Sequence, residues 1–493
     1  MVTPMTNKPS PAPLTHDFSY ARLPDQFYAR VPPSPVAAPA MVLFNDGLAA
    51  QLGLPGGWSA KETMLSYLAG NEMPGGAQPL AMAYSGHQFG GWSPILGDGR
   101  AQLIGEIKTP DGDFDLQLKG SGPTLYARRG DGRATLGAVI REYIISEAMA
   151  GLGIPTTRSL AVIATGETVA RGAALPGGVL ARTARSHIRV GTFQFAAAHI
   201  GPEGTKALAD YFIKRNFPKI DVGDPDKYLA LLTEAIERQA NLVAKWMCVG
   251  FIHGVMNTDN MSITGETIDY GPCAFMDDFH PQKTFSSIDH QGRYAWNNQP
   301  AMAVWNLSRF AECLLPLLAN DEDKALKLAQ GALDKFAPTY KTAYYEGMAS
   351  KLGLSGPDED FTAETLNTMA EQNIDFTLFF RRLTQIANGS TDTDFIALFR
   401  DENTGADWLR NWQETAKPNA KSIAIMNAIN PIYIARNHRV EAAIRAAEDE
   451  GDYAPFKHLA KLLATPFTQQ KGQDHMEAPP AEHEIVRETF CGT

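Results

Sequence analysis

The stretch from His253 to Gly271, HGVMNTDNMSITGETIDYG, constrains the chain more than any other. Within it, Asn260 and Asp269 flank a run, MSITGETI, that predicts a short hairpin with its turn at Gly265-Glu266. An amide and a carboxylate brought side by side supply hard oxygen ligands, which Mg²⁺ takes together with substrate phosphates. The stretch therefore predicts a metal site, although an Asp-Asn pair in a polar loop also serves ordinary turn formation.

The same stretch lacks the base of an ordinary kinase. In kinases with such a loop, the catalytic Asp lies two residues after the His and the metal-binding Asn follows five residues later. Here His253 and Asn260 keep that spacing, but the intervening position is Val255, which accepts no proton. The nearest carboxylate is Asp259, so a base, if the site has one, is expected to be displaced along the loop.

Length and composition exclude several classes of protein. The chain has 493 residues, enough for two lobes with additions. Its net charge of −11 disfavours nucleic acid and anionic membranes as partners, and no run of about 18 apolar residues predicts a membrane helix. The N-terminal segment lacks the apolar core of a signal peptide, so a cytoplasmic protein is expected. The four cysteines show no CxxC spacing and predict neither a zinc site nor a disulfide framework.

The order of patterns along the chain predicts four parts. Residues 1–80 are rich in proline and are expected to be an extension that wraps the core. Residues 81–185 contain strand-like runs, and residues 186–320 contain the predicted metal and catalytic loop. Residues 321–493 are expected to be a helical C-terminal extension that ends in a Cys-containing tail. The expected fold class is α+β, with a β-rich N-lobe and a helical C-lobe.

A lysine and a glutamate of the first lobe are arranged like a phosphate-binding pair. PDGD predicts a hairpin turn between AQLIGEI and FDLQLKG, and the apolar face of the second run leaves Lys119 on the other face. The run ATLGAVIREYIISEAM has helical periodicity and places Glu142 on its polar side. Kinases pair a strand lysine with a helix glutamate in this chain order. A solvated lysine and a surface glutamate are the alternative.

Basic residues gather between Lys119 and Arg189. This segment carries ten Lys or Arg against four Asp or Glu, and nine of the ten are Arg. Arginine suits bidentate contacts to phosphate, whereas a solvated basic face is usually richer in lysine. The segment therefore predicts an anionic ligand, and the turn from Gly97 to Arg100 offers backbone N–H groups that could approach its phosphates.

Four blocks of the sequence resemble the selenoprotein O family, whose members have a two-lobed protein-kinase-like fold. The blocks are YSGHQFGGWSPILGDGRAQLIGEI, LQLKGSGPTLYARRGDGRATLGAVIREYIISEAM, GVLARTARSHIRVGTF and HGVMNTDNMSITGETIDYGP. The resemblance implies a protein adenylyltransferase (AMPylase), which transfers AMP from ATP to Ser, Thr or Tyr hydroxyls of target proteins and releases pyrophosphate. It also implies that ATP binds in an inverted orientation, so that the α-phosphate is attacked. Such an enzyme has no need of a base at Val255.

The resemblance implies a role for each matching residue. Asp259 is expected as the proton acceptor, and Asn260 and Asp269 as ligands of Mg²⁺ or Mn²⁺. The residues expected to bind the nucleotide are Gly97, Gly99, Arg100, Lys119, Asp131, Gly132, Glu142, Arg182, Arg189 and Asp269. Family members carry selenocysteine or cysteine near the C-terminus, and Cys491 occupies that place here. A regulatory disulfide between Cys273 and Cys491 is therefore a hypothesis.

Three other functions stay open on the sequence. UMP transfer from UTP with Mn²⁺ would need only a permissive base pocket. An ordinary γ-phosphate kinase is disfavoured by Val255, and a non-catalytic pseudokinase scaffold would bind nucleotide without consuming it. The expected partners are ATP and proteins bearing Ser, Thr or Tyr hydroxyls, with no nucleic acid and no membrane, and the chain is expected to be a monomer.

Overall fold

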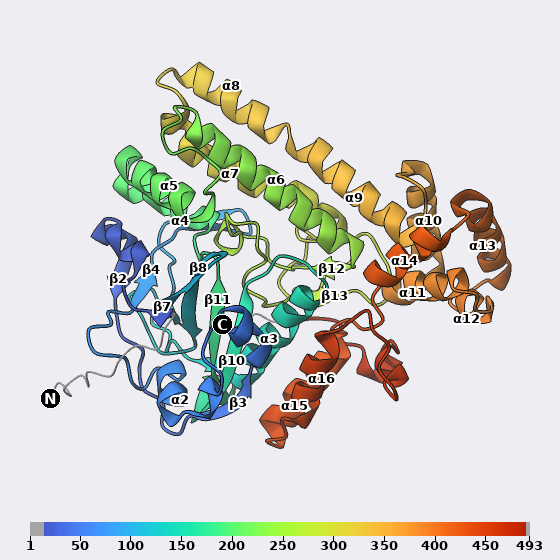
Figure 1. Cartoon of the computed structure of the whole chain (residues 1–493), viewed down its shortest axis with the longest axis horizontal. Helices are drawn as coiled ribbons and strands as arrows, with labels where there is room; N and C mark the ends of the chain where they lie inside the picture. The colour runs from blue at the N-terminus through green and yellow to red at the C-terminus, as the bar shows by residue number, and fades with distance from the viewer. Residues whose placement is uncertain (1–13, 490–493) are drawn as a thin grey trace.

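The structure of the chain is a computed structural model that describes residues 14–489. Its N-terminal part is organised around one antiparallel sheet with the strand order β2-β4-β7-β8-β11-β10-β3, extended by β1 beside β7 and β9 beside β11 (Figure 1). The strands of this sheet are β1 (Leu14–Thr15), β2 (Tyr28–Arg30), β3 (Ala40–Phe44), β4 (Leu80–Met82), β7 (Ala101–Thr109), β8 (Gly112–Lys119), β9 (Ala134–Thr135), β10 (Arg158–Arg171) and β11 (Ala173–Ala184). The sheet is the expected β-rich N-lobe.

Strands β7 and β8 form the hairpin that the PDGD turn predicts, with Thr109 opposite Gly112. Leu116 and Leu118 are buried on one face of β8, as the alternation predicts. The other face is not solvated, because Gln117 is fully buried too. Strand β8 is central in the sheet, between β7 and β11. Lys119, at the end of β8, therefore points toward a polar interior instead of open water.

Helix α3 (Leu136–Gly151) packs against β10 and β11. Its first turn is capped by Thr135, whose Oγ1 accepts from the backbone N of Ala138 at 3.3 Å. The opposite side of α3 is covered by helices α15 (Asn437–Asp449) and α16 (Ala454–Leu463). Glu142, expected on a polar side of this helix, is buried and accepts from Lys119 of β8 and Arg182 of β11.

The C-terminal half of the chain is helical. Helices α6, α7, α8 and α9 pack side by side across the top of Figure 1, and α10 to α14 form a further group at its right. The helices from α4 to α14 are α4 (Val190–Phe195), α5 (Pro202–Asn216), α6 (Lys227–Cys248), α7 (Gln299–Leu318), α8 (Glu322–Leu333), α9 (Phe336–Leu352), α10 (Glu359–Gln372), α11 (Phe376–Ala387), α12 (Thr393–Ile396), α13 (Glu402–Ala416) and α14 (Ala420–Ile429). The expected two-lobed, kinase-like α+β class is confirmed.

Residues 14–80 are built into the N-lobe. Strands β2 and β3 pair with β4 and β10, and so lie at the two ends of the main strand order. The short helices α1 (Asp46–Gln51) and α2 (Glu62–Leu68) pack into an apolar core that includes Trp58, Ile104 and Leu116. Apolar residues of this Pro-rich segment thus complete a core on the sheet, while the boundary at residue 80 stays a prediction.

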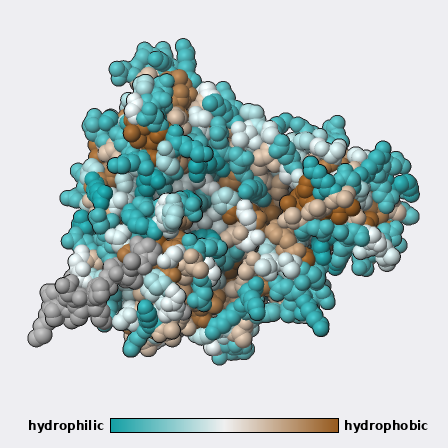
Figure 2. Space-filling model, in the orientation of Figure 1, coloured by the Kyte–Doolittle hydropathy of each residue, from teal (hydrophilic) through white to brown (hydrophobic). Residues whose placement is uncertain are grey.

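The surface in Figure 2 is mostly hydrophilic, with an apolar stretch toward the helical C-terminal part. None of the helices between residues 14 and 489 has the length and apolar character that crossing a bilayer requires. The largest core joins α3 to the helices of the C-lobe. The two lobes therefore share apolar packing, and the loop between β12 (Phe251–Ile252) and β13 (Ala274–Phe275) lies where they meet.

Candidate active site

The loop between β12 and β13 carries both acids that the sequence singled out. At its start, the fully buried ring of His253 donates from Nε2 to the carbonyl oxygen of Ile268 at 3.0 Å. Its Nδ1 accepts from the backbone N of Val255 at 3.4 Å. The imidazole thus ties the beginning of the loop to the residue before Asp269. Asp269 itself has a φ of +63°, a conformation that needs support from its surroundings.

The prediction of a hairpin over residues 261–268 is wrong, because the two arms of this run do not pair with each other. The backbone N of Gly265 donates to the carbonyl of Ser262 at 3.3 Å, so a turn does occur here. The two arms, however, pair outward: Ser262 bridges Arg189, and Thr267 bridges Thr156. An isolated two-stranded hairpin is only marginally stable, and neighbouring segments offer these backbone groups other partners. The loop is consequently fastened at two points, one beside Thr156 and one beside Arg189.

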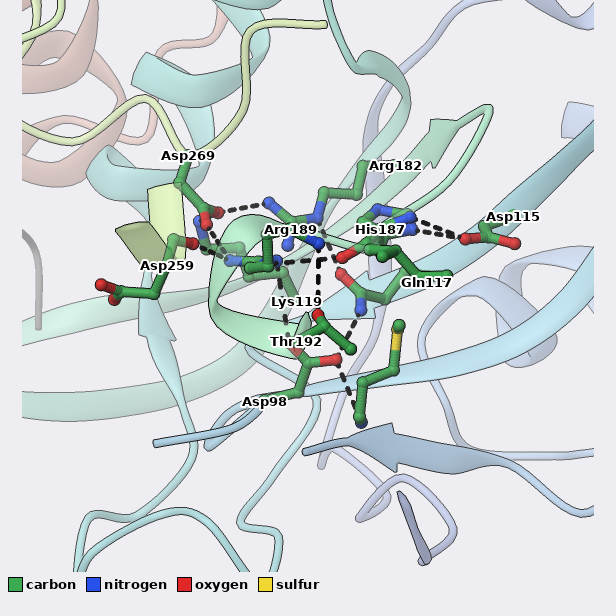
Figure 3. Close-up of polar contacts among 12 residues, drawn as sticks. Asp98, Asp115, Gln117, Lys119, Arg182, His187, Arg189, Thr192, Asp259 and Asp269 are labelled. Carbon is green, nitrogen blue, oxygen red and sulfur yellow. Dashed lines mark hydrogen bonds and ion pairs between the residues drawn. The ribbon is translucent and has the colours of Figure 1, made fainter. Parts of the chain in front are cut away.

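Asp269 lies at the centre of a cluster of cationic side chains (Figure 3). Its Oδ1 accepts from Lys119 Nζ at 3.1 Å and from Arg182 Nη1 at 2.7 Å. Its Oδ2 accepts from Arg189 Nη1 at 2.7 Å. Glu142 binds two of the same cations, accepting from Lys119 at 2.5 Å and from Arg182 at 2.8 Å. The predicted contact between Lys119 and Glu142 is therefore present.

Four elements supply this cluster. Lys119 ends β8, Arg182 lies on β11 directly opposite Gln117 of β8, and Glu142 comes from α3. Arg189 is the N-cap residue of α4, and its side chain is 2% exposed. Burial by itself raises the pKa of Asp269, but the charges of Lys119, Arg182 and Arg189 hold that pKa well below its usual range. Three cations that converge on one point are suited to hold phosphate oxygens.

Asp259 lies on the same loop in the opposite kind of environment. The residue is 7% exposed, and its Oδ2 accepts from Gln88 Nε2 at 3.1 Å. Its Oδ1 is buried and has no hydrogen-bond partner within residues 14–489. Burial raises the pKa of Asp259 to about 6. A carboxylate with such a pKa can accept a proton at neutral pH and release it again.

Asn260 and Asp269 offer the donor set of a nucleotide-bound divalent cation. Asn260 Nδ2 donates to the carbonyl oxygen of Val255 at 3.1 Å, which leaves its Oδ1 to act as a ligand. Together with the Asp269 carboxylate, this provides the hard oxygens that Mg²⁺ or Mn²⁺ takes beside phosphates. The described residues contain no group of three or more His, Cys, Asp or Glu that could hold a metal. The pair fits a metal that arrives with the nucleotide.

Two glycine-containing loops lie against each other beside the cationic cluster. Gly97 has a φ of +84°, and a Cβ there would lie 2.3 Å from the ring of Tyr126. At Gly99 a Cβ would lie 2.8 Å from the carbonyl oxygen of Tyr126. Gly132 has a φ of +67°, and its Cβ would lie 2.1 Å from the backbone of Gly122. Only glycine allows this close approach, so these positions have a structural role whether or not they touch the nucleotide.

Arg100 and Asp131, which were also predicted to bind the nucleotide, lie in different surroundings. Arg100 follows Gly99 and directly precedes β7, and its carbonyl accepts from the backbone N of Gly120 at 2.7 Å. Asp131 stands apart from the cluster: it is exposed and forms a bidentate ion pair with Arg171, at 2.7 and 2.9 Å. A nucleotide contact from Asp131 therefore remains a prediction.

Three polar residues of the site, two of them buried and one half-buried, were not predicted. Asp98 is 3% exposed and accepts from Gln117 Nε2 at 2.9 Å, and Gln117 Oε1 accepts from Arg182 Nε at 2.9 Å. Gln88, in the strand β5 (Gly86–Gln88), holds Asp259. The sequence gives no signal for these roles, because an Asp between glycines looks like a solvated turn and a strand glutamine looks like a surface residue.

The proposed disulfide falls partly outside the described residues. Cys273 is buried, and Cys491 lies beyond residue 489, where the description ends. Near that end, Thr489 Oγ1 donates to the carbonyl oxygen of Pro272 at 2.6 Å. The tail thus passes beside the residue before Cys273, and the disulfide stays a prediction.

Comparison with known proteins gives matches over nearly the whole chain. The family described as Protein adenylyltransferase SelO matches residues 12–464. A protein nucleotidyltransferase YdiU of Rhodopseudomonas palustris (strain BisB5) is 55% identical over 486 residues, which cover 97% of this chain and 99% of the relative. Proteins of the same name from Bradyrhizobium diazoefficiens and Shewanella denitrificans are 52% and 50% identical over 483 and 491 residues. They cover 96% of this chain and 98% and 97% of their own lengths.

Proposed function

Because the chain belongs to the family of SelO protein adenylyltransferases and is a protein nucleotidyltransferase, we propose that it transfers AMP from ATP to Ser, Thr or Tyr hydroxyls of target proteins. The observation that carries the proposal is the contrast between two acids of one loop. Asp269 is surrounded by cations, whereas Asp259 is buried with a raised pKa. Phosphoryl chemistry needs such a division between charge stabilisation and proton acceptance.

The cations of the cluster hold the phosphates of ATP. Lys119, Arg182 and Arg189 meet at Asp269 from separate elements, so their donors converge on a small volume. Arginine forks bind phosphate oxygens in pairs, and a lysine adds a point charge. Glu142 orients Lys119 and Arg182 from behind. Charge that develops on the phosphate oxygens and on the leaving pyrophosphate is then stabilised by groups already in place.

Asp259 receives the proton of the acceptor hydroxyl. The hydroxyl oxygen attacks the α-phosphorus, the bond from that phosphorus to the pyrophosphate oxygen breaks, and the proton moves to the Asp259 carboxylate. Of the two carboxylate oxygens of Asp259, Oδ2 accepts from Gln88, and Oδ1 has no hydrogen-bond partner within residues 14–489. Arg189 also donates to the backbone carbonyl of Asp259, at 2.8 Å, which fixes the base relative to the cations.

A divalent cation would be held by Asn260 and Asp269. Its charge, when Mg²⁺ or Mn²⁺ is bound, neutralises the triphosphate. The protein contributes an amide oxygen and a carboxylate, both fixed by the loop that His253 ties together. Asp269 is shared between this role and the three cations, so metal and phosphates are expected to bind together.

The function is tested with ATP labelled on either its α- or its γ-phosphate. The full-length protein is incubated with a cell extract and Mg²⁺ or Mn²⁺, beside the variant Asp269→Ala and the control Asp278→Ala, which changes an exposed acid nearby. Label from the α-phosphate alone, lost in Asp269→Ala and kept in Asp278→Ala, is the expected result. Label from the γ-phosphate would instead indicate an ordinary kinase, and label from α-labelled UTP but not from α-labelled ATP would indicate UMP transfer.

A further inference from the structure

Strand β8 carries a row of polar side chains on one face. Asp115, Gln117 and Lys119 alternate along the strand with Leu116 and Leu118, and side chains two residues apart lie on the same face of a strand. Asp115 and Gln117 are 2% and 0% exposed, although neither belongs to the cationic cluster. Buried polar groups need hydrogen-bond partners to offset the cost of their desolvation. The partners of these two residues lead to the arginines of the site.

Gln117 lies behind Arg182. The two residues are opposite each other on β8 and β11, and Gln117 Oε1 accepts from Arg182 Nε at 2.9 Å (Figure 3). The other end of the amide is fixed too, because Gln117 Nε2 donates to Asp98 Oδ2 at 2.9 Å. The same oxygen of Asp98 accepts from the backbone N of Met82 at 3.2 Å. An acceptor on one side therefore fixes the orientation of the Gln117 amide and turns its oxygen toward the arginine.

Asp115 supports Arg189 through His187. Asp115 Oδ2 accepts from the backbone N of His187 at 2.9 Å and bonds to its ring Nδ1 at 3.1 Å. Its Oδ1 accepts from Arg215 Nη2 at 2.6 Å. Burial raises the pKa of Asp115, but Arg215 and His187 lower it to about 2. His187 is thus held by a fixed anion, and its backbone carbonyl accepts from Arg189 Nε at 3.3 Å.

Arg182 and Arg189 are therefore anchored in the same way. In each arginine, Nε donates to a partner that β8 supplies or holds, and Nη1 donates to Asp269 at 2.7 Å. A guanidinium group is planar and rigid, so a fixed Nε restricts the directions in which its other two nitrogens point. The partners behind Nε thus set the planes of both forks.

We propose that Gln117 and Asp115 are positioning residues for phosphate binding, Gln117 by way of Arg182 and Asp115 by way of His187 and Arg189. The assignment rests on the proposed function, in which these arginines hold the phosphates of ATP. Groups that stabilise charge are effective when they are already oriented before the reaction. A fork that loses its support is expected to bind the phosphates more weakly and to slow the transfer.

The test uses two full-length variants, Gln117→Met and Asp115→Asn, which keep the size of each side chain and weaken the support. The matched controls are Asn430→Leu and Asp375→Asn, which change a buried amide and a buried acid of the helical C-terminal part. Asn430 bonds to Lys351 at 2.9 Å, and Asp375 pairs with Arg436 at 2.7 Å. The controls therefore cost the fold similar contacts without touching the arginines of the site.

The first measurement is the Kd for the α,β-methylene analogue of ATP with Mg²⁺, by calorimetry, because this analogue cannot release pyrophosphate. The initial rate of α-label transfer and the Tm are measured for the same proteins. If Gln117→Met does not fold, Gln117→Asn takes its place, since its amide is one methylene too short to keep both bonds. Each support variant is expected to bind the analogue about tenfold more weakly, as for loss of a group that orients a binding residue. The controls are expected to lower the Tm and to leave the Kd within about twofold.

Paired substitutions show which arginine each residue acts through. In an Arg182→Met background, Gln117→Met is expected to weaken binding by less than about twofold further, whereas Asp115→Asn keeps its effect of about tenfold. In an Arg189→Met background the two results are expected to be exchanged. Such a pattern does not arise from a general loss of stability, which would act in both backgrounds alike.

A Kd equal to that of the controls would overturn the assignment, and so would full effects of both variants in both backgrounds. If the wild-type protein binds the analogue but transfers no α-label, the proposed function fails, while the Kd values still decide the role of Gln117 and Asp115. If the wild-type protein does not bind the analogue, both proposals fail.

Discussion

Asp259 and Asp269 belong to one loop, but the two regions around them are built in opposite ways. Asp269 has three cationic partners within 3.1 Å and a pKa held well below its usual range. Within residues 14–489, the carboxylate of Asp259 accepts one side-chain hydrogen bond, from Gln88, and its pKa is raised to about 6. In the proposed function, the same chemical group therefore serves as a permanent anion at one end of the loop and as a proton acceptor at the other. Environments that separate two pKa values in this way assign the roles of the two acids.

Arg189 is the physical link between the two regions. Its Nη1 donates to Asp269 Oδ2 at 2.7 Å and to the backbone carbonyl of Asp259 at 2.8 Å. It thus neutralises one carboxylate while it contacts only the backbone of the other. This difference shows how one buried arginine can serve both regions without lowering the pKa of the base to that of the anion.

The largest effect is expected from removing the charge at Asp269. The variant Asp269→Asn keeps the volume but takes away the carboxylate shared by Lys119, Arg182 and Arg189. AMP transfer is expected to fall by at least about 10³-fold, since loss of a charged group at a reacting phosphate costs on the order of 4 kcal/mol of transition-state stabilisation. The initial rate of α-label transfer measures this change. A fall of less than tenfold would contradict the central place given to Asp269.

A smaller effect that is confined to the chemical step is expected from Asp259→Asn. This substitution removes the proton acceptor and leaves the cationic cluster intact, so kcat is expected to drop by about 10²- to 10³-fold. The KM for ATP should stay within about twofold, because only the backbone of Asp259 contacts Arg189. Steady-state kinetics with varied ATP separates the two constants. A loss that appeared mainly in the KM for ATP would place Asp259 in nucleotide binding.

Arg189→Lys tests the link itself. A lysine ends in a single nitrogen, so it cannot keep the two bonds of Arg189 Nη1 together with the bond that Arg189 Nε donates to the His187 carbonyl at 3.3 Å. We expect about 10- to 100-fold lower kcat/KM together with a lower Tm, because both regions lose a buried contact. Arg185→Lys is the matched control, since Arg185 lies nearby but donates to the carbonyl of Asp111 instead. Equal effects of the two substitutions would show that Arg189 has no special position.

The smallest effect is a pH dependence that reports only on Asp259. The ionised form is the base, and its pKa is raised to about 6, so transfer should rise as the pH passes upward through 6 and fall about tenfold per unit below it. Asp269 stays ionised across this range because its pKa is lowered. Gln88→Leu removes a hydrogen bond that lowers the pKa of Asp259, so the limb should move to higher pH. A rate profile that is flat from pH 8 to pH 5 would contradict the assignment.

Much of the site could be predicted because its residues follow a recognisable chain order. Lys119, Glu142, Asn260 and Asp269 were picked out by spacing and by element type, and the structure brings Lys119, Glu142 and Asp269 into direct contact. The excess of arginine before Arg189 also predicted an anion site, and Arg182 and Arg189 do converge on Asp269. The pairing of residues 261–268 was missed, because partners far away in sequence replaced the local ones.

The sequence by itself determined the β-rich first lobe, the helical remainder and the absence of a carboxylate at the usual base position, Val255, because periodicity and spacing are local properties of a chain. Only the tertiary structure decided which acid is held as an anion and which has a raised pKa. Burial and the charges within a few ångströms set a pKa, and those neighbours come from β5, β8, β11, α3 and α4. The support behind Arg182 and Arg189 likewise exists only because β8, β11 and the turn before α4 meet in the folded chain.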